Sequence, residues 1–139
     1  MAFSVNSRIK LNFGKIKALE ANQVKALEMT TDALLTEVKN AEVMPFDTGN
    51  LQNENTFPDY SDSHTGVTRI VSSTPYARRL YYHPEYNFHR EVWYDKDGKE
   101  HGANRNAGGL WLEPWKKGGT RQNFCVEAFA KIYKELNGT

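Results

Sequence analysis

The sequence predicts an α+β fold, in which an antiparallel β-sheet is packed by a long N-terminal helix and a C-terminal helix and carries a projecting β-hairpin. Two stretches, 16–43 and 121–136, have apolar residues every three or four positions, which is typical of amphipathic helices. The stretch 67–72 is rich in β-branched residues and lies between polar segments, which is typical of a half-buried antiparallel strand. The dipeptide Asp97-Gly98 favours the turn of a two-stranded hairpin.

The chain is expected to begin with an extended arm over 1–14, because apolar residues alternate loosely there. The helix over 16–43 follows, and at 1.5 Å per residue it is about 40 Å long, so part of it is expected to reach a neighbour. Its apolar stripe is thin and includes a glutamine and threonines, so one side is expected to be solvated or packed on polar groups. The stripe consists of Ile16, Leu19, Gln23, Leu27, Thr30 or Thr31, Leu34, Val38 and Ala41.

A sharp turn is expected where the first helix ends. Pro45 disfavours helical backbone before it, Asp47 can accept hydrogen bonds from later backbone N–H groups, and Gly49 can adopt the positive φ of a tight turn. Beyond this turn, 51–57 and 67–73 are expected to form an antiparallel pair of strands around an acidic loop. The turn consists of Pro45, Asp47, Thr48, Gly49 and Leu51, and the loop contains Pro58, Asp59, Asp62 and Gly66.

A short helix is expected over 76–82. The hydroxyl groups of Ser73 and Thr74, followed by Pro75, favour a capped helix start. Pro84 is expected to end this helix.

An exposed hairpin arm is expected over 86–107, with 86–94 as its first extended run. A flexible polar loop over 102–109 is expected to lead from it to an aromatic run. The last helix, 121–136, is expected to be capped by Thr120 and to end before Gly138.

Length, charge and composition limit the kinds of protein that this chain can be. The length of 139 residues predicts a single domain, 1–139, and the net charge of +1 disfavours a dedicated nucleic-acid binder. The only cysteine, Cys125, cannot form an internal disulfide, and its apolar neighbours predict a buried thiol. No apolar run reaches the roughly 18 residues of a membrane span, and the first residues lack the pattern of a signal peptide, so we expect a cytoplasmic protein.

Two groups of residues invite an enzymatic interpretation. His83, Glu85 and His89 could serve a metal-dependent hydrolase or nuclease, but their spacing fits no helical two-histidine zinc pattern. The triplet that begins at Asp47 is similar to the catalytic triplet of aspartic proteases, but it follows a polar helix and a proline, so we interpret it as a turn. The chain has no glycine-rich phosphate loop and no serine nucleophile elbow. We expect no enzyme activity, no metal and no cofactor.

A dense basic and aromatic patch points instead to contacts with other proteins. Tyrosine, tryptophan and arginine dominate protein interfaces because they bury a large area and keep a polar group. The expected interface residues are Tyr76, Arg78, Arg79, Tyr81, Tyr82, Trp93, Trp111 and Trp115. The alternative is a nucleic-acid-binding module, with bases stacking on Tyr81 and Tyr82 and phosphates bound by basic side chains. Those side chains would be Arg69, Arg78, Arg79 and Arg105.

Four motifs in a fixed order carry a family resemblance. They are Pro45 to Leu51 after a helix, Val67-Thr68-Arg69-Ile70-Val71, Pro75-Tyr76-Ala77-Arg78-Arg79-Leu80, and Gly108-Gly109-Leu110-Trp111-Leu112-Glu113-Pro114-Trp115. With this order the chain resembles the small head-to-tail joining proteins of long-tailed phages, often described as minor capsid or tail-component proteins. The segment 83–107 departs from the family pattern, because a compact step is expected there in place of a His/Tyr-rich hairpin.

The resemblance implies a structural role in the phage neck, within the virion, after assembly in the host cytoplasm. It implies a hexameric or dodecameric ring of this chain that joins the head connector to the tail. The implied partners are a portal-side or adaptor-side neck protein and the tail terminator or tail-tube protein. DNA would be in contact only while passing through the lumen, for which the acidic segment 47–62 is a candidate wall because negative charge repels DNA.

Overall fold

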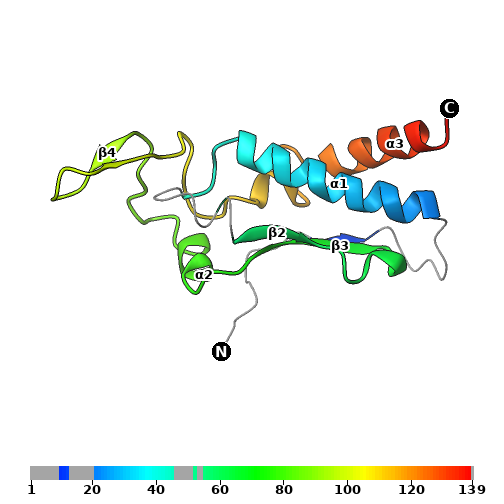
Figure 1. Ribbon diagram of the computed structural model, residues 1–139, viewed down its shortest axis with the longest axis horizontal. Helices are drawn as coiled ribbons and strands as arrows, with labels where there is room; N and C mark the ends of the chain where they lie inside the picture. Colours follow the sequence, from blue (N-terminus) through cyan, green and yellow to red (C-terminus); the bar gives the residue numbers. More distant parts are fainter. Residues whose placement is uncertain (1–9, 13–20, 46–51, 53–54, 139) are drawn as a thin grey trace.

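The computed structural model describes residues 10–12, 21–45, 52 and 55–138 (Figure 1). The fold is α+β, as predicted. One face of a three-stranded antiparallel sheet is covered by helix α1 (Ala21–Asn40), and helix α3 (Phe124–Leu136) lies along α1. A second sheet of two short strands projects from one end of the molecule (Figure 1).

The three-stranded sheet has the order β1-β3-β2, with β3 (Val67–Ser72) in the centre. β1 (Lys10–Asn12) and β2 (Thr56–Asp59) both pair with it in the antiparallel sense, so the expected strand pair is confirmed. Residues 10–12 are the only part of the expected N-terminal arm that the structure describes. Along β3, side chains alternate between half-buried and buried, which places every second residue under α1.

β2 lies further along the chain than predicted. Pro58 and Asp59 were expected in the loop, but they belong to the strand, and Pro58 lies opposite Ile70. β2 is an edge strand, where the missing N–H group of a proline need not be paired. The prediction therefore failed because it treated proline as a strand breaker at a position that tolerates it.

Helix α1 packs on the sheet partly through hydroxyl groups. Its buried positions include the predicted Leu27, Leu34 and Val38, and also Thr30 and Thr31. The hydroxyls of these threonines donate to backbone carbonyls four residues earlier, at 2.7 and 2.9 Å. The Thr31 hydroxyl also lies 2.5 Å from that of Thr68 in β3. The expected polar packing of this helix is thus confirmed. The expected turn residues Asp47, Thr48, Gly49 and Leu51 lie outside the described residues, while Pro45 is half-buried.

Helix α3 runs antiparallel to α1. Asn22 near the start of α1 donates to Asn137 just after α3 at 2.9 Å, and Glu37 near the end of α1 lies 3.6 Å from Arg121. The helix begins at Phe124 after an Asn123 cap without a side-chain bond, so the predicted start at residue 121 and the Thr120 cap are wrong. The reason is that the backbone of 119–122 is held in turns against the segment before it, with the Arg121 N–H donating to the Pro114 carbonyl.

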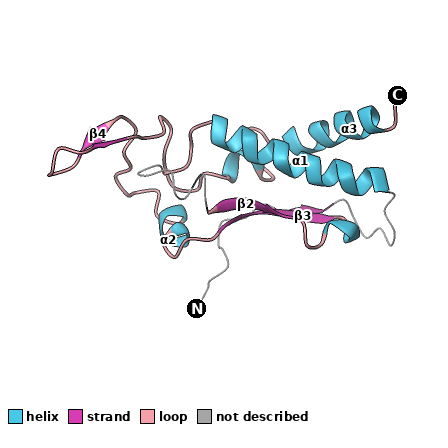
Figure 2. Cartoon of the chain, viewed as in Figure 1, coloured by secondary structure: helices cyan, strands magenta, loops and turns pink. Residues whose placement is uncertain are grey.

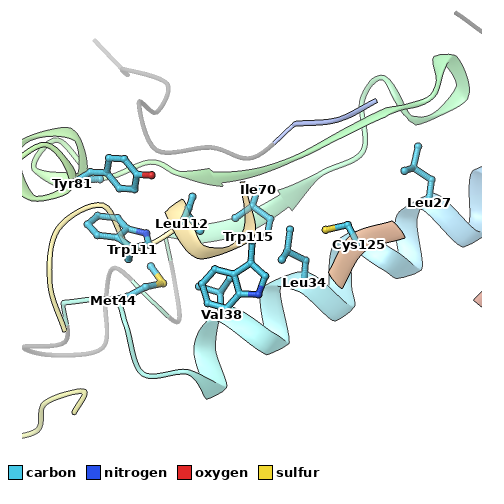
Figure 3. Packing of buried hydrophobic residues seen from close by; sticks show 11 residues of the cluster. Leu27, Leu34, Val38, Met44, Ile70, Tyr81, Trp111, Leu112, Trp115 and Cys125 are labelled. Carbon is cyan, nitrogen blue, oxygen red and sulfur yellow. The ribbon is translucent and has the colours of Figure 1, made fainter. Parts of the chain in front are cut away.

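The core joins both helices, the sheet and the aromatic run 110–115. Figure 3 shows Trp115 beside Leu34 and Val38 of α1, and Trp111 beside Met44. The run contains a short 3-10 helix, η3 (Glu113–Trp115), and a second one, η2 (Ser63–Thr65), lies between β2 and β3. Further core members are Leu27, Ile70, Ala77, Tyr81, Leu112 and Cys125.

The projecting arm ends in β4 (Trp93–Tyr94) and β5 (Glu100–His101), which pair in the antiparallel sense. Gly98 has φ 79° at its turn, so the hairpin prediction at Asp97-Gly98 is confirmed. The extended run expected over 86–94 forms a strand only at its last two residues, and the rest is loop (Figure 2).

Candidate functional site

The short helix α2 (Ala77–Tyr81) lies between the sheet and the arm, and it presents the exposed members of the predicted patch (Figure 1). Tyr76 and Tyr82 are 42% and 52% exposed, and Arg78 and Arg79 are also exposed. We call this area, with Pro75 and His83, the α2 surface. It contains an open hollow of about 390 Å³ lined by Pro75, Arg78, Arg79, Tyr82 and His83.

The backbone of α2 explains which side chains face outward. Ala77 and Tyr81 are four residues apart on one helical face, and both are buried, while the arginines between them face solvent. The helix does not have the predicted hydroxyl cap: the Thr74 hydroxyl is buried without a hydrogen-bond partner in the described part of the chain, and the Thr74 carbonyl accepts from the N–H of Ala77. The predicted helix is therefore confirmed, and its predicted cap is wrong.

Three predicted interface residues lie in the core. Tyr81, Trp111 and Trp115 are 0%, 2% and 4% exposed. The Tyr81 ring meets Trp111 edge to face at 4.8 Å, and its hydroxyl donates to Glu113 at 2.9 Å. Burial and this hydrogen bond raise the pKa of Tyr81. These three side chains are thus part of the core of the single chain, and they could reach a partner only if the core opened.

The side chain of Arg79 is held in place by Tyr86. Its Nε donates to the Tyr86 hydroxyl at 3.0 Å, and its guanidinium lies 5.7 Å from the centre of that ring. The imidazole of His83 stacks on the Tyr86 ring, with ring centres 4.7 Å apart, and its Nδ1 lies 2.8 Å from Glu85. The hydrogen bond to Tyr86 raises the pKa of Arg79. These contacts orient Arg79 and leave its terminal nitrogens available, since neither is used in the bond to Tyr86.

The arginines of the α2 surface differ from three other arginines in their ion pairs. Within the described ranges, Arg69, Arg105 and Arg121 each lie in an ion pair with a carboxylate. In the same ranges no carboxylate pairs with Arg78 or Arg79. One carboxylate, that of Glu85, lies against His83 of the α2 surface, so the two arginine charges there are only partly offset.

The remaining predicted interface residue, Trp93, holds the arm together. Its indole lies between the imidazoles of His89 and His101, with ring centres 4.0 and 4.3 Å away and nearly parallel planes. It is half-buried by them. His101 also bonds Asp95 at 2.9 Å, and the same carboxylate accepts from the N–H groups of Asp97 and Lys99. These bonds, the one to His101 first, lower the pKa of Asp95.

The residues that could serve a metal-dependent hydrolase, His83, Glu85 and His89, do not form one cluster. His83 contacts Glu85 and Tyr86, whereas His89 stacks on Trp93. In the described ranges, His, Cys, Asp and Glu side chains form no group of three that could hold a metal ion. Burial raises the pKa of the Cys125 thiol to about 11, so it is protonated at neutral pH.

Sequence reasoning missed the residues that fix the base of the arm. Asn104 is buried, and its Nδ2 donates to the Met44 carbonyl at 2.8 Å and to Gln52 at 2.7 Å. Asn106 and Arg105 bond to Ala41 and Glu42, the two residues just after α1. The loop 102–109 was predicted to be flexible, but these contacts anchor it. The sequence offers no local signal for them, because asparagine in a glycine-bounded loop is equally typical of a solvated turn.

Comparisons with protein families, with curated proteins and with solved structures found no match to this chain. Among the described residues, no helix is both long enough and apolar enough to cross a membrane. The candidate function therefore rests on the α2 surface, on the arm beside it and on the order of the sequence motifs.

Proposed function

We propose that this chain is a structural protein of the neck of long-tailed phages, in which copies of it form a hexameric or dodecameric ring between the head connector and the tail. The order of the motifs from Pro45 to Trp115 suggests the neck. The observation that carries a contact role is the α2 surface, where two arginines without a carboxylate partner in the described part of the chain lie between exposed tyrosines.

The geometry suits a protein that works by contact. A ring forms when one surface of a subunit binds a different surface of the next and the rotation closes. The α2 surface and the projecting arm lie at the same end of the sheet (Figure 1), so one end of the subunit offers two adjoining contact elements. The proposed partners are a portal-side or adaptor-side neck protein and the tail terminator or tail-tube protein.

Three of the six side chains that the nucleic-acid alternative requires have other roles in the structure. Arg69 lies 2.7 Å from Asp62, Arg105 lies 2.7 Å from Glu42, and Tyr81 is buried. Arg78 and Arg79 pair with no carboxylate in the described ranges, and Tyr82 is exposed, so these three side chains could still face a nucleic acid. Binding of duplex DNA requires several phosphate contacts along a backbone, and two of the four arginines of this alternative are already held in ion pairs.

Light scattering tests the proposal. The purified chain is measured alone and mixed with the tail-tube protein and with the portal-side neck protein of the same phage. The expected result is a complex of defined mass that is weakened by Tyr76→Ser combined with Tyr82→Ser, because exposed tyrosines of an interface contribute much of its energy. The control is Val126→Ser in α3, at a position 61% exposed and outside both contact elements. A chain that remains monomeric with every virion component would overturn the proposal.

A further inference from the structure

We infer that the α2 surface binds a carboxylate-bearing segment of a partner protein, with Arg78 and Arg79 taking the carboxylates and Tyr82 packing against the apolar atoms of the segment. This inference rests on the proposed function and names the chemistry of the partner at that site. Its basis is the combination of a hollow, two guanidinium groups without carboxylates and flanking rings on one short stretch of chain.

The two arginines are suited to carboxylates in different ways. Arg79 is held by Tyr86 through Nε, so its terminal nitrogens present a fixed edge, and less side-chain freedom is lost when an anion binds. Arg78 is exposed, and within the described ranges no side chain pairs with it, so it can turn toward the same ligand. Guanidinium groups bind carboxylates through two parallel hydrogen bonds, which gives both affinity and orientation.

The surroundings favour a protein segment over a polyanion. Pro75 and the ring of Tyr82 line the hollow beside the arginines, so a bound chain would contact apolar and charged surface together. A nucleic acid carries one charge per ~3.4 Å of each strand and requires a track of cations. The other described arginine that lies in no ion pair, Arg90, instead donates to the Ala107 carbonyl at the base of the arm. A pair of neighbouring arginines therefore matches a short acidic segment better than a long polyanion.

Nuclear magnetic resonance titration of the full chain tests this inference, since the chain has a mass of only 15.9 kDa. The probe is a blocked pentapeptide of alternating glutamate and tyrosine. The comparison probes are the same peptide with glutamine in place of glutamate and a single-stranded oligonucleotide of twelve thymidines. The expected result is a shift of the side-chain N–H signals of Arg78 and Arg79 with the acidic peptide only.

Charge-matched variants locate the site. Arg78→Gln or Arg79→Gln should each weaken binding of the acidic peptide about tenfold, because each removes a charge-assisted contact. Arg105→Gln is the control, because it removes the same charge from an exposed position paired with Glu42. The Arg105→Gln variant should lose less than about twofold in affinity for the acidic peptide, since surface charges at a distance are screened by salt.

Several results would overturn the inference. Equal binding of the glutamine peptide would show that carboxylates are not recognised, and an equal loss in Arg105→Gln would show a non-specific charge effect. Tighter binding of the oligonucleotide, lost in Arg78→Gln, would assign the surface to nucleic acid. The proposed function fails separately: a chain that binds the acidic peptide at Arg78 but stays inert with every virion component would refute the neck role and retain this inference.

Discussion

Single side chains connect segments of this protein that are far apart in sequence. Asn104, at the base of the arm, is the clearest case, because its amide group joins Met44, in the segment after α1, to Gln52. Asn104 is buried, so each of these hydrogen bonds replaces one that the bonded groups would make to water in the unfolded chain. The hydroxyl contact between Thr31 and Thr68 does the same between α1 and the sheet. At this scale, polar groups determine the packing as much as apolar ones do.

Replacing Asn104 with alanine should destabilise the whole fold. The change removes both donor contacts and leaves the buried Met44 carbonyl without its partner, which costs about 1–3 kcal/mol of unfolding free energy. Urea unfolding followed by circular dichroism measures this loss. Asn106→Ala is the control, because its exposed side chain also donates to a backbone carbonyl, and its expected cost is below about 1 kcal/mol. Equal losses in the two variants would contradict the anchoring role of Asn104.

The elements divide into those that sequence periodicity determines and those that distant contacts determine. α1, α3 and β3 are long or strongly patterned, so their existence was predictable from the sequence, although α3 begins three residues later than expected. The position of β2 was not predictable, because its pairing with β3 overrides the turn preference of Pro58. The α2 surface was predictable as a patch of arginine and tyrosine. Which of its rings is buried depends on the packing of Tyr81 against Trp111, which no local pattern encodes.

The arm hairpin should depend on pH through Asp95. Its hydrogen bonds to His101, Lys99 and Asp97 lower the pKa of the folded carboxyl below its unfolded value of about 3.9. The stabilisation is therefore complete above that unfolded value and is lost as pH falls through the lower folded pKa. Nuclear Overhauser effects between protons of Trp93 and His101, measured by NMR, report on the paired strands. They should persist from pH 7 to about 4.5 and weaken below that pH.

Two variants check the assignment of this pH dependence. Asp95→Ala should lose the cross-strand contacts at every pH, because it removes the acceptor of three hydrogen bonds. Asp97→Asn should keep them, since Asp97 takes part in the turn through its backbone N–H. Loss of the contacts between pH 7 and 5 in the unaltered chain would rule out Asp95 as the determining group.

The molecule as a whole combines one shared core with a projection outside it. The core cluster takes side chains from α1, β3, α2, α3 and the run 110–115, so these elements are expected to unfold together. The hairpin of the arm contributes no residue to that cluster and is held by two paired residues on each strand and a stack of three rings. Local opening of the arm should therefore require much less free energy than global unfolding.

Hydrogen exchange measures this difference. Amides of β3 and of the middle of α1 should exchange only through global unfolding, at roughly 5–15 kcal/mol, while the paired amides of 93–101 should exchange through openings of a few kcal/mol at most. The Asp95→Ala variant should abolish protection in the arm and leave that of β3 unchanged. Equal protection of the arm and β3 in the unaltered chain would show that the two form one cooperative unit.

The anchored loop at the base of the arm has a mechanical consequence. Asn106 and Asn104 fasten this loop to Ala41, just after α1, and to Met44. Arg90, in the loop before β4, donates to the Ala107 carbonyl in the loop after β5. A force applied to the hairpin tip is thus carried by both segments of the arm, the one before β4 and the one after β5. It reaches the residues that directly follow α1, the longest helix. Tension applied by a neighbour would load the α1 axis from its end, and the flexible element in that linkage would be the hairpin itself.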